Sequence, residues 1–349
     1  MSEVEVEGVV LVVGGSGYLG LHLLHYFATS TRFRLAFTYS KSDSPPPAPF
    51  LQKVPSFRVD LRTGAGLSEI SDSLGPPSVV VNCAAIAIPR ECEENPELAD
   101  GVNVPRSIIH WLKSFAHNKP LLIHLSTDQV YEGTKLFYKE EDETKPVNVY
   151  GKTKVDAEKL IRVNWPNYAI LRSSIIYGPQ PAFPVPKTLP IQWIDSTLAS
   201  GTKTDFFSDE FRCPVYVKDV MKVVVLIMIN SMAVGGFSQL LLNVGGPDRL
   251  SRAGMAEVVA QVRGHDVALI NHVSASTVNR GVKSPLDISM NISKVKAQLG
   301  INMTSFSDGV KETFEYNAAV TKQVNVEVTA ADPKDDVKEP LHESGPEEQ

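Results

Sequence analysis

The chain has 349 residues with 43% hydrophobic and 21% charged side chains, a balance that is ordinary for a globular enzyme. Its formal net charge of −6 and the lack of a basic stripe argue against nucleic acid as the main partner. Three cysteines without C-x-x-C spacing, an acidic first segment and no apolar run of membrane-spanning length lead us to expect a cytoplasmic protein without a disulfide framework, zinc site or membrane anchor.

The first predicted element is a strand over residues 9–13, followed by a glycine-rich turn and a helix. The strand is entirely apolar, which is typical of a parallel strand buried on both faces. Gly14, Gly17 and Gly20 follow with G-x-x-G-x-x-G spacing, which occurs in ordinary tight turns and in dinucleotide-binding turns. We favour the second interpretation, because the turn opens a helix whose free N–H groups can face a pyrophosphate. The residues expected to contact the dinucleotide are Gly14, Gly15, Ser16, Gly17, Tyr18, Leu19 and Gly20.

The second predicted strand, residues 34–39, ends where the adenosine ribose of a dinucleotide lies. An acidic residue there would accept from the 2′-hydroxyl of NAD, whereas this chain has Ser40 and Lys41, which suit a 2′-phosphate. The pattern therefore favours NADP(H) over NAD(H), unless both residues are plain surface loop. A third short strand ends in Asp60 and Leu61, and the Asp60 carboxylate can accept from the adenine amino group or cap a turn.

The fourth predicted strand, which starts at residue 79, is followed by small residues. Cys83, Ala84 and Ala85 allow the backbone and a cofactor to pass closely, and we interpret Cys83 as a small core residue rather than a nucleophile. Asn103, near the next helical pattern, suits a cofactor-binding role and a buried structural role equally.

The fifth predicted strand, residues 121–125, is followed by a polar segment. Polar residues just beyond the carboxyl end of a parallel strand lie in the ligand crevice. We expect Ser126 to contact the cofactor, Thr127 to bind a carbonyl oxygen, and Asp128 and Gln129 to contact the substrate.

A helix predicted over residues 146–161 carries Tyr150 and Lys154, which lie on one face because they are four residues apart. A tyrosine hydroxyl has a pKa near 10, and a neighbouring ammonium favours the phenolate and lowers that pKa. The pair can then donate a proton to a carbonyl oxygen while a hydride reaches the carbonyl carbon. We predict that this pair and Thr127 form the catalytic group.

Together these motifs resemble those of an extended short-chain dehydrogenase/reductase, and within that superfamily those of the dTDP-4-dehydrorhamnose reductase (RmlD-like) family. The likeness covers roughly residues 9–320, and its motifs fall in order. Its most specific stretches are residues 126–131, 147–154, 170–178 and 209–220. The resemblance implies an α/β fold, namely a Rossmann-type doubly wound parallel sheet with a smaller C-terminal substrate lobe.

The resemblance also implies roles for individual residues. Thr127 would polarise the carbonyl and Tyr150 would be the acid. Lys154 would tune Tyr150 and hold the nicotinamide ribose. Ser173 and Ser174 would lie beside the nicotinamide. The implied activity is NADP(H)-dependent reduction of a carbonyl in a 4-keto-6-deoxy nucleotide sugar.

Two other functions are implied by related proteins. The same family contains the regulatory β subunit of methionine adenosyltransferase, which binds NADP(H) and the catalytic subunit, and a binding subunit can retain the catalytic set. Sugar-nucleotide dehydratases read Thr-Asp-Glu where this chain has Gln129, an amide that does not titrate, so we do not favour dehydration. Residues 86–89 are apolar where the reductases usually carry polar residues, so the substrate contacts can differ.

The remaining third of the chain is expected to complete the substrate lobe. Arg212 and Arg280 are candidates for pairing with a substrate phosphate, although Arg212 can equally form an internal salt bridge with Asp209 or Glu210. The expected division is an NADP-binding domain over 1–178 with 213–248 returning to it, a substrate lobe over 179–212 and 249–322, and a disordered acidic tail over 323–349.

Overall fold

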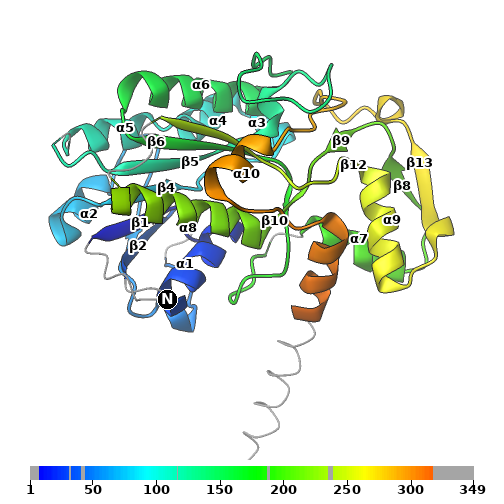
Figure 1. Cartoon of the computed structure of the whole chain (residues 1–349), viewed down its shortest axis with the longest axis horizontal. Coiled ribbons are helices and arrows are strands. Elements are labelled where there is room, and N and C mark those ends of the chain that lie inside the picture. The colour runs from blue at the N-terminus through cyan, green and yellow to red at the C-terminus, as the bar shows by residue number, and fades with distance from the viewer. Residues whose placement is uncertain are drawn as a thin grey trace, which may run out of the picture.

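A parallel sheet organises the chain in the computed structural model, which describes residues 8–30, 33–40, 44–115, 117–186, 189–234 and 239–316 (Figure 1). Within these residues, seven strands pair in the order β11-β6-β5-β4-β1-β2-β3, and every pairing is parallel. The strands are β1 (Val9–Val13), β2 (Arg34–Tyr39), β3 (Ser56–Arg58), β4 (Val79–Asn82), β5 (Leu121–Thr127), β6 (Tyr168–Ser173) and β11 (Leu240–Val244). The predicted doubly wound α/β class is confirmed.

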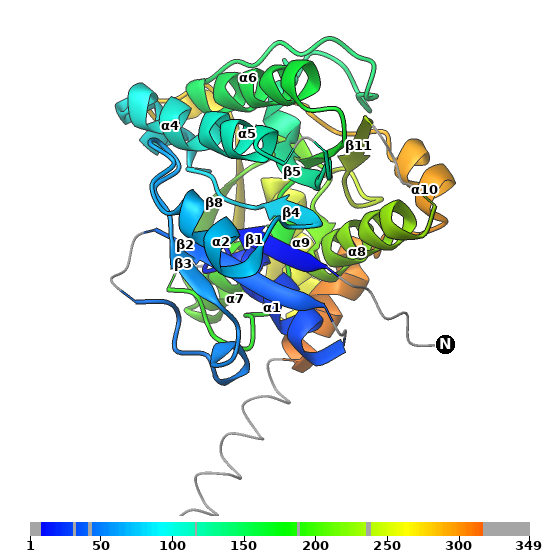
Figure 2. The ribbon, with the colours of Figure 1, turned by 90° about the vertical axis from the view of Figure 1, so that its left-hand side faces the viewer.

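Helices cover both faces of the sheet (Figure 2). One face carries α1 (Tyr18–Ser30), α8 (Val217–Val234) and α10 (Ser293–Leu299), and the other carries α2 (Leu67–Leu74), α5 (Arg106–Lys113) and α6 (Val149–Asn164). Alternate residues of β1 supply both interfaces, since Val10 and Val12 face the first set and Leu11 faces the second. Burial on both faces explains why β1 is apolar throughout.

The strand order reverses between β1 and β4, which are neighbours in the sheet but are followed by connections that run in opposite directions. Ligands of open α/β sheets bind outside the carboxyl ends of the strands at such a point. Gly14 lies there with a φ of +75°, and a Cβ on it would lie 2.8 Å from the Ala84 Cα. The turns after β1 and β4 therefore meet at a separation that only glycine permits.

A smaller set of elements lies beside the carboxyl end of the sheet, on the right of Figure 1. It contains α7 (Pro190–Ala199), α9 (Arg252–Arg263), the parallel pair β8 (Thr204–Phe207) and β13 (Ile270–Val273), and the antiparallel pair β9 (Phe211–Arg212) and β12 (Leu250–Ser251). A further short parallel pair, β7 (Ile176–Tyr177) and β10 (Val215–Tyr216), lies between this set and the sheet. Residues 306–316 are helical.

Most predicted boundaries agree with the structure, and two differ. The helix expected from residue 146 begins at Val149, because the Asn148 side chain accepts from the Gly151 N–H at 2.8 Å and caps it. β5 extends to Thr127, so Ser126 and Thr127 belong to the strand itself. Ser251 caps α9 by accepting from the Gly254 N–H at 3.0 Å. The predicted tail, residues 323–349, lies outside the described residues.

No helix within the described ranges is long and apolar enough to cross a membrane. The same ranges hold no group of three or more His, Cys, Asp or Glu side chains that would suit a metal ion.

Candidate active site

The end of β5 and the start of α6 bring the predicted catalytic residues together. After Thr127 the chain forms the 3-10 turn η2 (Asp128–Val130), in which Thr127 Oγ1 accepts from the Gln129 N–H at 3.2 Å. Asn148 Nδ2 donates to Gln129 Oε1 at 2.8 Å and so ties η2 to the first turn of α6. Gln129 was predicted to contact substrate, but its side-chain oxygen is used to anchor this helix.

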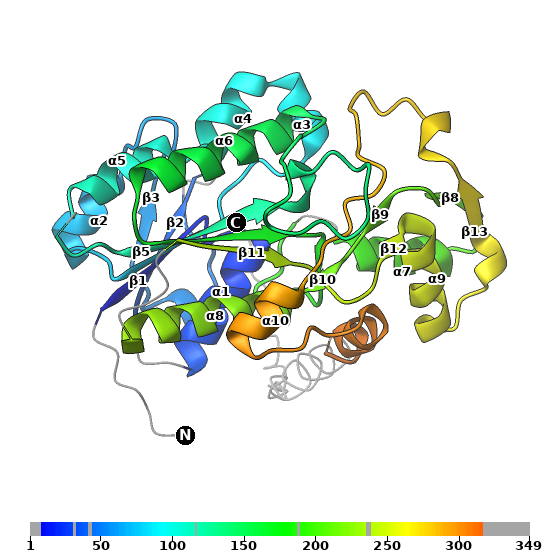
Figure 3. The same ribbon diagram turned by 45° about the horizontal axis from the view of Figure 1, so that its top comes forward.

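Tyr150 lies in the first turn of α6, with only 8% of its surface exposed. It packs against Cys92 and Ala99, which belong to α3 (Pro89–Glu94) and α4 (Pro96–Asn103). Figure 3 shows α3 and α4 lying alongside α6. The phenol lies beside the Thr127 hydroxyl, so two of the residues predicted to be catalytic are neighbours.

The expected lowering of the Tyr150 pKa by Lys154 is wrong for this arrangement. Burial raises the pKa of the Tyr150 phenol above its ordinary value, and the nearby Asp128 carboxylate raises it further, with only Thr127 opposing. Lys154 does not lower the pKa of Tyr150, because its ammonium contacts the Leu125 carbonyl and His124 instead of the phenol. A phenol with a raised pKa stays protonated at neutral pH, which is the form that an acid catalyst needs.

Lys154 is 1% exposed and ends a buried polar chain. Its Nζ donates to the Leu125 carbonyl at 2.5 Å and lies 3.2 Å from His124 Nε2. His124 Nδ1 lies 3.1 Å from Asn82 Nδ2, and Asn82 Oδ1 accepts from the Ala84 N–H at 3.2 Å. The sequence interpretation missed His124, although a histidine inside an apolar parallel strand signals a buried polar contact.

His124 is neutral at pH 7, because burial and the Lys154 charge lower its pKa well below the ordinary value. Burial lowers the pKa of Lys154 to about 8, with Glu158 opposing, and keeps the neutral form accessible.

This lowered pKa makes stability depend on pH in a defined direction. The unfolded chain, with its lysine pKa near 10.5, binds the proton more tightly than the folded chain, so stability gained through Lys154 rises from about pH 8 to about pH 10. We expect the wild-type protein to gain about 3 kcal/mol relative to a Lys154→Met variant over that interval. Urea denaturation of both proteins at several pH values measures the difference, and a constant difference would contradict it.

The predicted cofactor residues near the switch point have varied surroundings. Ser40 is exposed at the end of β2, and Lys41 lies outside the described residues. The Asp60 carboxylate accepts from the Arg62 guanidinium at 2.5 Å and from the Arg62 N–H at 3.0 Å, as a turn aspartate does. The Leu61 carbonyl accepts from a serine hydroxyl of α5 at 2.6 Å.

Three further predicted cofactor residues lie after β4. Burial raises the pKa of the Cys83 thiol to about 12, which agrees with a core residue and not with a nucleophile. Ala84 is half-buried and packs against the core beside the glycine turn, and Ala85 is exposed.

Two predicted cofactor residues are used inside the protein. Asn103 is fully buried. Its Oδ1 accepts from the Ile86 N–H at 2.8 Å, and its Nδ2 donates to the Ile86 carbonyl at 3.1 Å and to Thr153 Oγ1 at 3.0 Å. The Ser126 hydroxyl donates to Glu158 Oε1 at 2.5 Å. Both residues position the loop and helix around the site, because their polar groups already have protein partners.

Asp128, Ser173 and Ser174 lie together at the ends of β5 and β6. The Ser174 hydroxyl donates to Asp128 Oδ2 at 2.7 Å, and Thr127 Oγ1 donates to Asp128 Oδ1 at 3.2 Å. Burial raises the pKa of Asp128, while the Arg212 charge opposes that change. The Ser173 hydroxyl donates to the Ser126 carbonyl at 3.2 Å.

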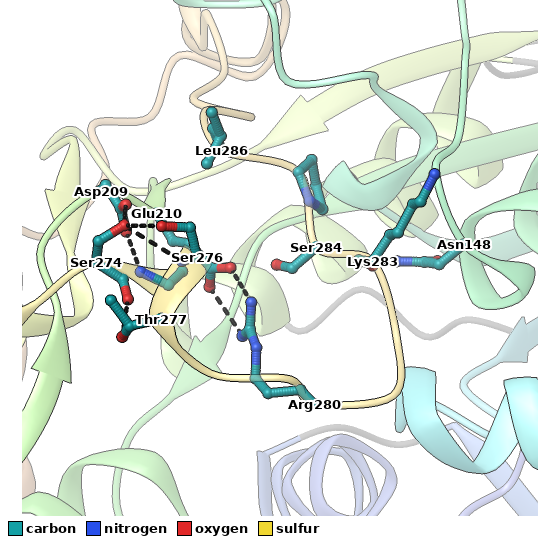
Figure 4. Close-up of polar contacts among 12 residues, drawn as sticks. Asn148, Asp209, Glu210, Ser274, Ser276, Thr277, Arg280, Lys283, Ser284 and Leu286 are labelled. Carbon is teal, nitrogen blue, oxygen red and sulfur yellow. Dashed lines mark hydrogen bonds and ion pairs between the residues drawn. The ribbon is translucent and has the colours of Figure 1, made fainter.

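The two predicted phosphate ligands are occupied by protein groups. Arg212 is 3% exposed and donates to the Phe211 and Pro285 carbonyls (2.7 and 3.0 Å) and to Ser284 Oγ (3.1 Å). The alternative, a direct salt bridge to Asp209 or Glu210, does not occur among the ion pairs of the described residues. Figure 4 shows that Glu210 instead pairs with Arg280.

The Asp209 carboxylate is hydrogen-bonded to the segment that follows β13. It accepts from the Ser274 hydroxyl at 2.5 Å and from the Ala275 N–H at 2.8 Å (Figure 4). Neither carboxylate forms an ion pair with Arg212 among the described residues, so the predicted internal salt bridge is wrong, whereas phosphate binding by Arg212 stays a prediction.

A glycine turn at a sheet switch point, with a threonine at the end of β5 and a Tyr-x-x-x-Lys pair on α6, defines an extended short-chain dehydrogenase/reductase. This class consists of NAD(P)-dependent oxidoreductases and related proteins. Residues 8–318 match the model of the RmlD substrate binding domain family, and the chain belongs to this family.

Three relatives illustrate the range of the similarity. The chain is 29% identical to the probable low-salt glycan biosynthesis reductase Agl14 of Haloferax volcanii. The alignment spans 258 residues and covers 73% of this chain and 82% of that protein. It is 30% identical to methionine adenosyltransferase 2 subunit beta of Pongo abelii. That alignment spans 242 residues and covers 68% of this chain and 70% of that protein. The crystal structure of dTDP-4-dehydrorhamnose reductase from Bacillus anthracis in complex with NADP shares the fold, with a TM-score of 0.72, 17% identity, and coverage of 89% of this chain and 100% of that one.

Proposed function

We propose that the protein is an NADP(H)-dependent reductase of a carbonyl in a 4-keto-6-deoxy nucleotide sugar, with Tyr150 as the proton donor. The observation that carries the proposal is the convergence of the Tyr150 phenol and the Thr127 hydroxyl beside the switch point, with Lys154 on the next turn of α6. The family and the reductase among its relatives support the same reaction class.

The residues at the switch point fit a dinucleotide. The turn after β1 precedes α1, and a Cβ at Gly17 would approach only the Gly14 carbonyl oxygen, at 3.3 Å, so a phosphate can come close to the backbone. Ser40 at the end of β2 supports NADP(H) over NAD(H), because it supplies a hydroxyl where an NAD-binding protein has a carboxylate.

In this mechanism NADPH, when bound, supplies the hydride. The Tyr150 phenol donates its proton to the carbonyl oxygen of the substrate. The Thr127 hydroxyl, once it turns from Asp128 Oδ1, hydrogen-bonds the same oxygen and orients it. Loss of the proton leaves a phenolate, which the Lys154 ammonium stabilises once it turns from the Leu125 carbonyl. When NADPH is bound, Lys154 would also hold the nicotinamide ribose, and Ser173 and Ser174 would border the nicotinamide.

We also propose the division of labour along the chain. Residues 1–178 with 213–248 bind NADP, and residues 179–212 and 249–322 bind the substrate. Support comes from β11, which pairs with β6 in the central sheet, and from α7, α9 and the β8–β13 pair, which lie apart from it. A cytoplasmic location completes the proposal, supported by free thiols at Cys83, Cys92 and Cys213.

The test is oxidation of NADPH, followed at 340 nm, with dTDP-4-dehydrorhamnose and a panel of other keto-sugar nucleotides. We expect turnover with NADPH to exceed turnover with NADH by about tenfold or more, since a 2′-phosphate partner contributes one charge-assisted hydrogen bond. The absence of turnover across the panel would contradict the proposal.

The second candidate is a regulatory subunit of methionine adenosyltransferase. The observation that favours it is the 30% identity to subunit beta of that enzyme. It predicts that the purified protein binds NADPH, reduces no keto-sugar and forms a stable complex with a methionine adenosyltransferase catalytic subunit in size-exclusion chromatography. Turnover of a keto-sugar without such a complex would rule it out.

A further inference from the structure

His124 is a buried histidine that the proposed mechanism does not use. It lies in the middle of β5, its side chain is fully buried, and it is opposite Asn82 in the register of β4 and β5. Burying a polar ring is costly unless its nitrogens have partners. A leucine would fill the same space without that cost, so the contacts of the ring are the feature that needs a physical reason.

Each ring nitrogen of His124 has one partner. Nδ1 lies 3.1 Å from Asn82 Nδ2, and Nε2 lies 3.2 Å from Lys154 Nζ. Asn82 Oδ1 accepts from the Ala84 N–H at 3.2 Å, so the amide that contacts the ring is itself anchored to the backbone. The ring is therefore fixed from the β4 side, and its other nitrogen is presented to Lys154.

These contacts hold Lys154 away from its expected partner. Tyr150 and Lys154 stand four residues apart on α6, where side chains can meet. Lys154 Nζ instead donates to the Leu125 carbonyl at 2.5 Å and contacts His124, and both of these groups belong to β5. A lysine has a flexible four-carbon stem, so its ammonium can move from β5 to the phenol.

The carboxylates near α6 do not hold Lys154 in this position. Among the ion pairs of the described residues, none involves Lys154, and Glu158 is paired with Arg172. The titratable neighbours of Lys154 besides His124 are Glu158 on α6 and Cys83 after β4. The contacts with His124 and the Leu125 carbonyl are therefore the ones that the ammonium must leave to reach the phenol.

The geometry points to His124 as a positioning residue that holds the Lys154 ammonium on β5 until NADPH binds. This inference rests on the proposed function, in which Lys154 contacts the nicotinamide ribose of bound NADPH and stabilises the Tyr150 phenolate. A contact that exists only in the free protein must be broken on binding, so it opposes binding. His124 acts in this way through Lys154 and without a reaction step of its own.

Binding of NADPH to the full-length protein, followed by fluorescence, tests the proposal with two variants. An asparagine places its amide near the Nδ1 position of a histidine, and a glutamine places it near the Nε2 position. We expect His124→Asn, which retains only the contact with Asn82, to bind NADPH about three- to tenfold more tightly than wild type, because one net hydrogen bond no longer has to be broken. His124→Gln, which retains the contact with Lys154, should bind NADPH like wild type.

Lys154→Met separates a positioning role from a merely structural one. Without the ammonium His124 has nothing to hold, so His124→Asn should change NADPH affinity by less than about twofold in the Lys154→Met background. A structural defect at His124 would weaken NADPH binding, and it would do so by the same factor in both backgrounds.

A spectrum of the wild-type protein gives an independent measurement. Long-range ¹H–¹⁵N spectra of the ¹⁵N-labelled protein report the ring nitrogens of histidine, and the His124 signals are those that Lys154→Met displaces. The His124 Nε2 resonance should move when NADPH is added, because Lys154 Nζ leaves it. Where a His124 variant does not fold, this wild-type spectrum decides.

Four results would each overturn the proposal. They are a His124→Asn variant that binds NADPH like wild type or more weakly, an equal gain in His124→Gln, a gain that persists in the Lys154→Met background, and a His124 resonance that NADPH does not move. Because no hydride transfer is measured, a protein that binds NADPH but reduces no keto-sugar leaves these results interpretable. A working reductase whose His124→Asn variant has wild-type affinity for NADPH rejects this inference alone.

Discussion

Replacing Tyr150 with phenylalanine should lower kcat for NADPH-dependent reduction by at least about a hundredfold, because the change removes one oxygen and with it the proton donor. The affinity for NADPH should change by less than about threefold, since the ring and its packing against Cys92 and Ala99 remain. Stopped-flow measurement of NADPH oxidation and fluorescence titration of NADPH binding separate the two effects. A variant that keeps most of the wild-type kcat would remove Tyr150 from the mechanism.

Tyr131→Phe is the matched control for this experiment. Tyr131 also stands four residues before a lysine, but it is fully buried and its hydroxyl donates to Asn243 Oδ1 at 2.8 Å. The Arg172 guanidinium donates to the same hydroxyl at 2.9 Å. Removing this hydroxyl should lower stability and leave kcat unchanged at temperatures where the variant is folded.

Glu158→Gln should lower the free energy of unfolding by about 3–5 kcal/mol, the usual cost of leaving one member of a buried ion pair unpaired. Glu158 and Arg172 are 3% and 2% exposed, and they join α6 to β6 with an Nη2–Oε2 distance of 2.7 Å. The amide retains the shape but not the charge, so the guanidinium would stay buried without a counterion. Urea denaturation followed by circular dichroism measures the loss.

An exposed ion pair provides the comparison. Arg90 and Glu94 lie four residues apart on α3 with an Nε–Oε1 distance of 2.9 Å, and both side chains are more than half exposed. Glu94→Gln should change the free energy of unfolding by less than about 1 kcal/mol. Equal losses in the two variants would show that burial of the Glu158–Arg172 pair does not determine its contribution.

The sheet and the catalytic pair were predictable because their signals are local. β1 and β2 match the predicted strands residue for residue, since β1 is a buried apolar run that ends at glycine and β2 has four consecutive buried residues in its middle. Tyr150 and Lys154 share a helix, so their spacing alone places them on one face.

The features that were missed depend on contacts between distant parts of the chain. β8 pairs with β13, whose residues lie far along the sequence, and neither has an alternating pattern. The partners of Arg212 lie at residues 284–286, and those of Lys154 lie on β5, so spacing could not show that both groups were engaged. The Tyr150 pKa likewise follows from packing against α3 and α4.

The buried ion pair between Glu158 and Arg172 affects the orientation of α6 and of the residues on it. Tyr150, Lys154 and Glu158 recur every fourth residue along α6, so they form one stripe that turns as a unit with the helix. The ion pair with Arg172 therefore fixes how α6 is rotated about its own axis, and with it the direction of the Tyr150 phenol two turns away. A substitution that weakens the Glu158–Arg172 ion pair would change the direction of the phenol without altering any residue proposed to contact the substrate.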